Sequence, residues 1–292
     1  MIESADSIGI AGTGRVAQAL GRLLSEAGQP VAAIAGRNWE RTTRAARFIS
    51  TSIIPATIEE LPAFASHILI AVSDKAVEPV ALLLARSGFQ RGVALHTCGA
   101  KGPQALVVLA DEGVSCGALH PMQSFASAEQ GVASMVGSFF SIDGDPEAIE
   151  WGSSIVTLVG GRSLRIHAED RSLYHAAAVM ASSYIAALIY GAVEILKAAG
   201  VERSTALSTL APLARTCAEN SLNLGPVEAL TGPIERGDSA TVLAHLKGLR
   251  SLPGPVKRLY GSAGQLVVQM AVLRGLPETK AAEIEEILRT AQ

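Results

Sequence analysis

Short apolar runs alternate with amphipathic segments along the first half of the chain. Runs of four to eight apolar residues between helical patterns are typical of βαβ units in a parallel sheet. We expect strands at Ser7–Ala11, Val31–Ala35, His67–Val72, Gly92–His96 and Val114–Ala118. Amphipathic patterns predict helices between them, near residues 15–27, 39–49, 76–85 and 103–110. Ligands of such a sheet bind outside the carboxyl ends of its strands, where the strand order reverses.

Two further strand candidates, Ser138–Ile142 and Ser163–Ile166, flank a helical pattern near residues 146–158 and would extend the sheet at one edge. The alternation then stops. Helical patterns fill the rest of the chain, at about 168–199, 203–223, 238–251, 255–273 and 278–290. The chain is therefore expected to fold as an α/β Rossmann domain with a mostly parallel, doubly wound sheet over residues 1–167, followed by an all-α domain over residues 168–292.

The segment Ala176–Val193 carries no charged residue and is long enough for a membrane span. Ser182, Ser183, Tyr184 and Tyr190 interrupt its apolar character. A helix without charge on any face also fits the interior of a large protein. We predict a buried helix and no membrane partner.

Charge and cysteine content narrow the class of protein. The formal net charge is −3 and the isoelectric point about 6.1, which gives no support for a nucleic-acid partner. Cys98, Cys116 and Cys217 show no metal-ligand spacing, so no metal is expected, and three cysteines form no closed disulfide set. The start, Met1–Asp6, lacks the features of a signal peptide. These observations favour a cytoplasmic protein.

The first predicted strand runs into Gly12-Thr13-Gly14-Arg15-Val16-Ala17, which has the dinucleotide-binding pattern G-x-G-x-x-A. Gly12 would form the tight turn, Gly14 would let a pyrophosphate approach the backbone, and Ala17 would let the helix pack on the strand. The free N–H groups at the start of the helix would face the phosphates. The dinucleotide-binding motif is required to follow a strand and to begin a helix, and here it lies between a predicted strand and an amphipathic helix. Further cofactor contacts are expected at the ends of neighbouring strands, from Val72, Ser73, Asp74, His96 and Thr97.

The end of the second strand distinguishes NAD from NADP. NAD-binding proteins place an acidic residue there to bond the ribose 2′-hydroxyl. This chain has Gly36, Arg37 and Asn38 instead, with no acid before Glu40. A guanidinium matches phosphate oxygens with two parallel hydrogen bonds, so Arg37 predicts NADP(H) as the cofactor.

Four stretches of the sequence resemble a known family. The chain is similar to a group of bacterial Rossmann-like proteins with a helical C-terminal domain of unknown function, related to 6-phosphogluconate-dehydrogenase-like enzymes. Pyrroline-5-carboxylate reductase and the deazaflavin-dependent NADP oxidoreductase have similar N-terminal domains. The resemblance implies an oxidoreductase and a homodimer built on the helical domain. It rests on His96–Ala100, His120–Phe125, Tyr174–Ala178 and Ala229–Asp238.

The same comparison also shows departures from the family pattern. Cys98 stands where the family usually has Ser, and Ser183 where it has Asn. Val179 takes the place of the Lys that many relatives carry four residues before that Asn. The usual Lys/Asn pair is therefore absent, and the relatives' mechanism does not transfer.

Carbonyl or imine reduction takes a hydride from the nicotinamide and a proton from an acid, and histidine is the common acid near neutral pH. His120 begins a His-Pro-Met stretch after the last parallel strand. His175 lies on the long apolar helix, four and eight residues before Val179 and Ser183, so that all three would share a face. Arg236 would bind a substrate carboxylate. The alternatives are a hydrogen-bonded core histidine at 175 and an arginine at 236 that fixes its own loop.

Three hypotheses follow. The first is an NADP-dependent oxidoreductase of a small carbonyl, imine or hydroxy acid, with His120, His175, Ser183 and Arg236 at the substrate. The second is a dinucleotide-binding sensor or partner-binding dimer without turnover, which the missing Lys/Asn pair favours. The third is a deazaflavin-dependent NADP reductase or a prephenate-dehydrogenase-like enzyme, although the catalytic His motif of the latter has no match here.

Overall fold

The structure is a computed structural model that describes residues 7–290, apart from the side chain of Ala168. Met1–Asp6, the segment in which signal-peptide features were sought, lies outside the described residues. The chain divides into two compact units, with the division between Met180 and Ala181. The boundary predicted after residue 167 precedes that division, and each unit is described by itself below.

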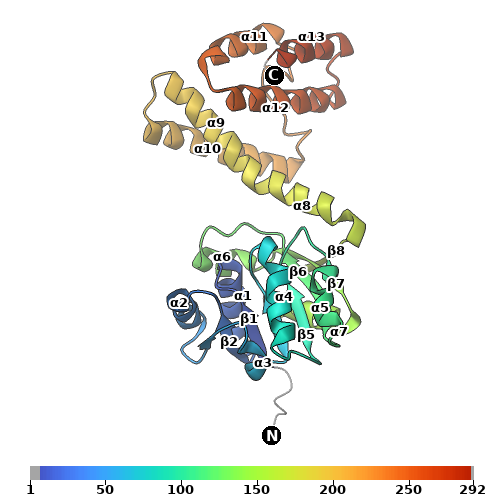
Figure 1. Ribbon diagram of the computed structural model, residues 1–292. Helices are drawn as coiled ribbons and strands as arrows, with labels where there is room; N and C mark the ends of the chain where they lie inside the picture. Colours follow the sequence, from blue (N-terminus) through green and yellow to red (C-terminus); the bar gives the residue numbers. More distant parts are fainter. Residues whose placement is uncertain (1–6, 291–292) are drawn as a thin grey trace. The chain divides into compact units, whose positions relative to one another are not determined.

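The first unit is built on an eight-stranded sheet with the order β3-β2-β1-β4-β5-β6-β7-β8 (Figure 1). Neighbouring strands are parallel except β6 and β7, which pair antiparallel. From β1 the chain continues in one direction through β2 and β3, and then crosses to the other side of β1 at β4. The gap between β1 and β4 is therefore the switch point of a doubly wound sheet. The strands are β1 (Ile8–Ala11), β2 (Val31–Ala35), β3 (Ile54–Ala56), β4 (His67–Ile70), β5 (Val93–His96), β6 (Ser115–Pro121), β7 (Phe139–Gly144) and β8 (Arg162–Arg165).

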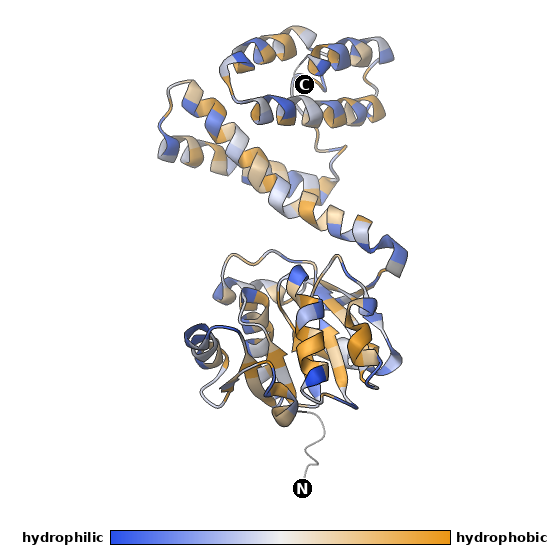
Figure 2. Ribbon diagram, viewed as in Figure 1, coloured by the Kyte–Doolittle hydropathy of each residue, from blue (hydrophilic) through white to orange (hydrophobic). Residues whose placement is uncertain are grey.

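Helices cover both faces of this sheet, as its central strands, hydrophobic in Figure 2, require. One apolar core packs α1, α2, α6 and α7 against one face, and a second packs α3, α4 and α5 against the other. The helices are α1 (Arg15–Glu26), α2 (Trp39–Ile49), α3 (Leu61–Phe64), α4 (Val77–Arg86), α5 (Val107–Ala110), α6 (Ala128–Met135) and α7 (Pro146–Leu158). The predicted fold class is confirmed. Sequence patterns missed β3, α3 and α6, which are short.

The second half of the chain is helical, as predicted. Its helices are α8 (Arg171–Val179), α9 (Ile185–Ala198), α10 (Arg203–Leu224), α11 (Ser239–Gly248), α12 (Gly254–Leu273) and α13 (Glu278–Arg289). A π-helical turn, Met180–Tyr184, joins α8 to α9. Within the second unit a small core, centred on Val242, Val268 and Ile284, holds α11, α12 and α13 together.

The long apolar helix differs from its prediction. Among the described residues, the helix Arg171–Ala198 is the one long and apolar enough to cross a membrane, by length and composition alone. Only 11% of its most apolar stretch is buried. The expected burial of the segment 176–193 is therefore wrong for the isolated chain, because α10 and α12 contact α9 but leave side chains such as Ile185, Leu188 and Tyr190 exposed.

Candidate functional site

A cleft of about 960 Å³ opens at the carboxyl ends of the strands around the switch point. The loops that follow β1, β2, β4 and β5 form its wall. This is where a doubly wound sheet binds its ligands. Most of the residues predicted to contact the cofactor line the cleft: Gly12, Thr13, Gly14, Arg15, Val16, Gly36, Arg37, Val72, Ser73, Asp74 and Thr97.

The glycine turn has the geometry that its sequence suggests. Gly12 has a φ of +122°, and a Cβ there would lie 2.1 Å from the carbonyl oxygen of Ala71. No other residue fits this position, because a side chain would be strained and would collide with backbone. Gly14 is the N-cap of α1, and nothing lies within 4 Å of where its Cβ would be. The backbone at Gly14 is therefore open to a ligand, while fully buried Ala17 packs the helix on the sheet.

Arg37 and Asn38, both expected at the ribose, have different environments. Arg37 lines the cleft, is exposed, and makes no ion pair or hydrogen bond to any described residue. The side chain of Asn38 caps α2 instead, accepting a hydrogen bond of 2.9 Å from the backbone N–H of Arg41. Asn38 is not among the lining residues, because capping turns its side chain toward the helix. Lys75, which sequence analysis passed over, adds a third cation to the wall beside Arg15 and Arg37.

His96 does not reach the cleft. Its side chain is fully buried, Nε2 lies 2.9 Å from the carbonyl oxygen of Gly102, and Nδ1 accepts a hydrogen bond of 3.2 Å from the N–H of Cys98. Burial lowers the pKa of His96, so the ring is neutral and donates through Nε2. The expected contact with the cofactor is corrected: both nitrogens are used to shape the loop 97–102, which carries Thr97 into the cleft.

That loop brings His120 and His175 together. A Cβ at Gly99 would lie 2.7 Å from both His120 Nε2 and His175 Nδ1, so the two imidazoles converge on a backbone that has no side chain. Their ring centroids are 6.0 Å apart. His120 comes from the end of β6 and His175 from α8, both within the first unit. The sequence predicted both residues but gave no reason for their proximity.

Tyr174 is the partner of His120 that sequence analysis did not assign. Its hydroxyl lies 2.9 Å from His120 Nδ1. Burial, followed by the charges of His175 and Arg171, lowers the pKa of His120 to about 4. His120 is therefore neutral near pH 7. A neutral imidazole still offers one N–H donor and one acceptor.

The remaining two predicted site residues belong to the second unit. Ser183 is exposed within the π-helical turn. The expected stacking of residues 175, 179 and 183 assumed an uninterrupted α-helix, and the wider π turn breaks that periodicity. Arg236 is exposed in the loop before α11, where Asp238 caps the helix by accepting a 3.0 Å hydrogen bond from the N–H of Thr241.

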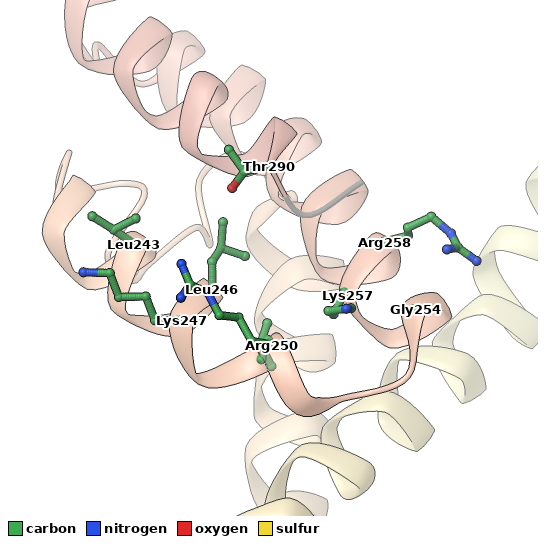
Figure 3. Close-up of a pocket in the computed structure, with 9 residues that line it drawn as sticks. Leu243, Leu246, Lys247, Arg250, Gly254, Lys257, Arg258 and Thr290 are labelled. Atoms are coloured by element: carbon green, nitrogen blue, oxygen red, sulfur yellow. The ribbon is translucent and has the colours of Figure 1, made fainter.

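A second hollow, of about 340 Å³, lies in the helical unit between α11 and α12 (Figure 3). Lys247, Arg250, Lys257 and Arg258 give it a positive lining. None of the described lining residues is a buried polar group, and its one lining glycine, Gly254, does not have a positive φ. The described residues also hold no group of three or more His, Cys, Asp or Glu side chains suited to a metal ion. The cleft of the first unit is therefore the better candidate site.

Comparison with known families agrees with this architecture. Residues 2–121 match the model of a Rossmann-like domain, and residues 138–267 match a domain of unknown function, DUF2520. The fold and the glycine turn, together with the first match, identify a protein that contains a Rossmann-like domain. More narrowly, the chain joins this domain to a DUF2520 domain, as the sequence resemblance indicated. No curated protein matches the chain.

Several solved structures share the fold. A protein from Bacteroides fragilis, described as an NADP oxidoreductase, has a TM-score of 0.72 at 21% identity, over 97% of this chain and 99% of that one. Pyrroline carboxylate reductase from Plasmodium falciparum, solved with NADP bound, has a TM-score of 0.59 at 13% identity, over 97% and 98%. A reductive aminase from Aspergillus terreus, in complex with NADPH and ethyl-5-oxohexanoate, has 0.60 at 14%, over 98% and 93%.

The neutral state of His120 predicts a distinct pH dependence. The folded pKa of about 4 lies below the ordinary value of 6.5, so the unfolded chain takes up this proton first as the pH falls. The stability that neutral His120 contributes is therefore complete above pH 6.5 and is lost between pH 6.5 and 4. In ¹⁵N-histidine NMR spectra, His120 should show no protonation between pH 8 and 5.5. The resonance is assigned by its absence from His120→Gln, with His245→Gln as the matched control. Protonation of His120 with a midpoint near 6.5 would contradict this description of the site.

Proposed function

We propose that the protein is an NADP(H)-dependent oxidoreductase that acts on a small carbonyl, imine or hydroxy acid. The observation that carries the proposal is the glycine turn Gly12–Gly14, which opens directly into the cleft at the switch point. The described residues fit a dinucleotide: Gly14 leaves its backbone free, and the N–H groups at the start of α1 have no side-chain cap. Such a helix start binds phosphate.

The two ends of the cofactor would have different environments. Arg37 would hold a 2′-phosphate, and Lys75 would add positive charge to the wall, because both cations line the cleft. Thr97 and Asp74 would lie near the other end, because the carboxylate of Asp74 bonds the thiol of Cys98 in the loop that reaches His120. When bound, the cofactor supplies a hydride at this end. Solved structures of the same fold, described as an NADP oxidoreductase or containing NADP or NADPH, support this choice of cofactor.

The two converging histidines would serve the substrate. His120 is neutral and hydrogen-bonded to Tyr174, so it would orient a carbonyl or imine by a hydrogen bond. His175 Nδ1 is buried and has no hydrogen-bond partner among the described residues, so it is the group we assign as proton donor. Roles of Ser183 and Arg236 at the substrate stay predictions from the sequence.

A second function has one observation in its favour. Val179 and Ser183 stand where related enzymes carry a Lys/Asn pair, which fits a dinucleotide-binding sensor without turnover. Steady consumption of NADPH in the presence of pooled small carbonyl metabolites would support the enzyme. Stoichiometric binding without consumption would support the sensor.

Arg37 gives the first functional prediction. Arg37→Ala should weaken NADPH binding by roughly 10- to 100-fold, the usual effect of losing hydrogen bonds to a charged group, and should leave NADH binding within about twofold. Quenching of tryptophan fluorescence or calorimetric titration measures both. Arg44→Ala, which removes the same charge from an exposed position of α2 outside the cleft, is the matched control. Equal losses for the two nucleotides would remove the 2′-phosphate role of Arg37.

We also propose a homodimer formed through the helical unit, in the reducing cytoplasm. The unit leaves large apolar side chains uncovered on two adjacent helices: Ile185, Leu188 and Tyr190 of α9, and Leu207, Leu213 and Leu222 of α10. A second copy would cover this surface, since apolar patches of this extent on soluble proteins mark interfaces. A lipid bilayer suits it less, because α10 also carries Arg215, Glu219 and Asn220.

The dimer predicts a mass of twice 30.2 kDa by size-exclusion chromatography with light scattering. Leu188→Lys should shift the protein toward the monomer, because it buries a charge in the interface. Val107→Lys, at an exposed apolar position of α5 in the first unit, is the control and should leave the mass unchanged. A monomeric wild type that partitions into phospholipid vesicles would contradict the dimer.

A further inference from the structure

One part of the sheet has a polar surface where the rest of that face is apolar. His120 pairs with Ser141 and Ala118 pairs with Asp143 across β6 and β7, so these side chains point to the same side. Elsewhere this face carries mostly small and aliphatic residues such as Ile70, Ala94 and Cys116, with His96 of β5 as a polar exception. The polar residues therefore gather on β5, β6 and β7, around His120.

Arg171, the first residue of α8, covers this polar surface. Its side chain is only 2% exposed, and its Nε lies 3.6 Å from the Oδ2 of Asp143. Nε, Nη1 and Nη2 are all buried, and none makes a hydrogen bond to a described residue. The Oδ2 of Asp143 is also buried without a hydrogen bond. A guanidinium has five N–H donors, and burying a charge with unmade hydrogen bonds is costly.

The same guanidinium belongs to the histidine cluster. Arg171, Tyr174 and His175 lie three and four residues apart on α8 and so share one face of that helix. Tyr174 bonds His120, and the positive charge of Arg171 acts on both His120 and Tyr174. Arg171 is thus the buried cation beside the groups that we assign to the substrate.

We propose that Arg171 binds the carboxylate of the substrate, which would make the substrate a short carboxylic acid with a nearby carbonyl or imine. This inference rests on the proposed function for the reaction but not for the anion site. Asp143 would hold the Nε edge of the guanidinium, and Nη1 and Nη2 would donate to the carboxylate, for which the planar guanidinium is suited. Shielding from water strengthens such a contact.

Oxalate is the probe for this site, titrated calorimetrically into the full-length protein with and without saturating NADP⁺, at constant ionic strength set with chloride. The wild type should bind oxalate. Arg171→Gln should weaken binding by roughly 10- to 100-fold, and its NADPH affinity should stay within about twofold. Arg165→Gln, which removes an exposed arginine from β8 of the same unit, should bind oxalate like the wild type.

A paired variant separates binding from folding. If Arg171 only neutralises Asp143, then Asp143→Asn/Arg171→Gln removes both charges and should regain stability and wild-type oxalate binding. The proposal instead expects the double variant to fold, bind NADPH and still fail to bind oxalate. Absence of oxalate binding to the wild type, or its recovery in the double variant, would overturn the proposal. Arg171-dependent oxalate binding by a protein that does not bind NADPH would support the anion site and reject the proposed function.

Discussion

The close approach of two backbones beside β1 is the constraint on which the candidate site depends. Gly12 lies so near the carbonyl of Ala71 that not even a methyl group fits between them. This contact turns the chain sharply from β1 into α1. It aims the N-terminus of α1 at the cleft, next to the loops that follow β2 and β4. A wider turn would move α1 away from the sheet and close the surface that the phosphates need.

The histidine pair, unlike the glycine turn, is positioned by buried side chains and not by a close backbone contact. Both ring nitrogens of His96 form hydrogen bonds within the loop that follows it. This loop places Gly99 against His120 and His175. Because Gly99 has no side chain, two imidazoles can converge there. Burial keeps His120 neutral, and the charge of Arg171 acts on it in the same direction. The two histidines and the cation beside them therefore form one polar layer against a mostly apolar sheet face.

Local patterns were sufficient for most of the fold. The strands Val31–Ala35 and His67–Ile70 and the helices α12 and α13 appear where hydrophobic periodicity placed them. The edge strand β3 was missed because three residues, one of them Pro55, carry no alternation. The π turn at Met180–Tyr184 was missed because its residues read as α-helix, and with it went the expected alignment of His175 and Ser183.

Some residues of the candidate site were predictable from local sequence, and others were not. The residues of the glycine turn and Arg37 are close in sequence to the strands that position them, so the motif sufficed to locate them at the cleft. Tyr174 and Arg171 were given no role because their partners, His120 on β6 and Asp143 on β7, lie far away in sequence. His96 was misassigned because its burial depends on the loop that it bonds.

The most direct test of the central claim, that the cleft holds an NADP-type cofactor on the glycine turn, is a thermal-shift titration with NADPH, NADP⁺, NADH and NAD⁺ on the wild type and Gly14→Val. Ligand at 100 times its dissociation constant adds about 2.7 kcal/mol of stability, which raises the melting temperature by several degrees. We expect this shift with NADPH and NADP⁺ for the wild type, and none for Gly14→Val, whose side chain would occupy the place of the pyrophosphate. The absence of a shift with all four nucleotides, or an equal shift in the variant, would contradict the account.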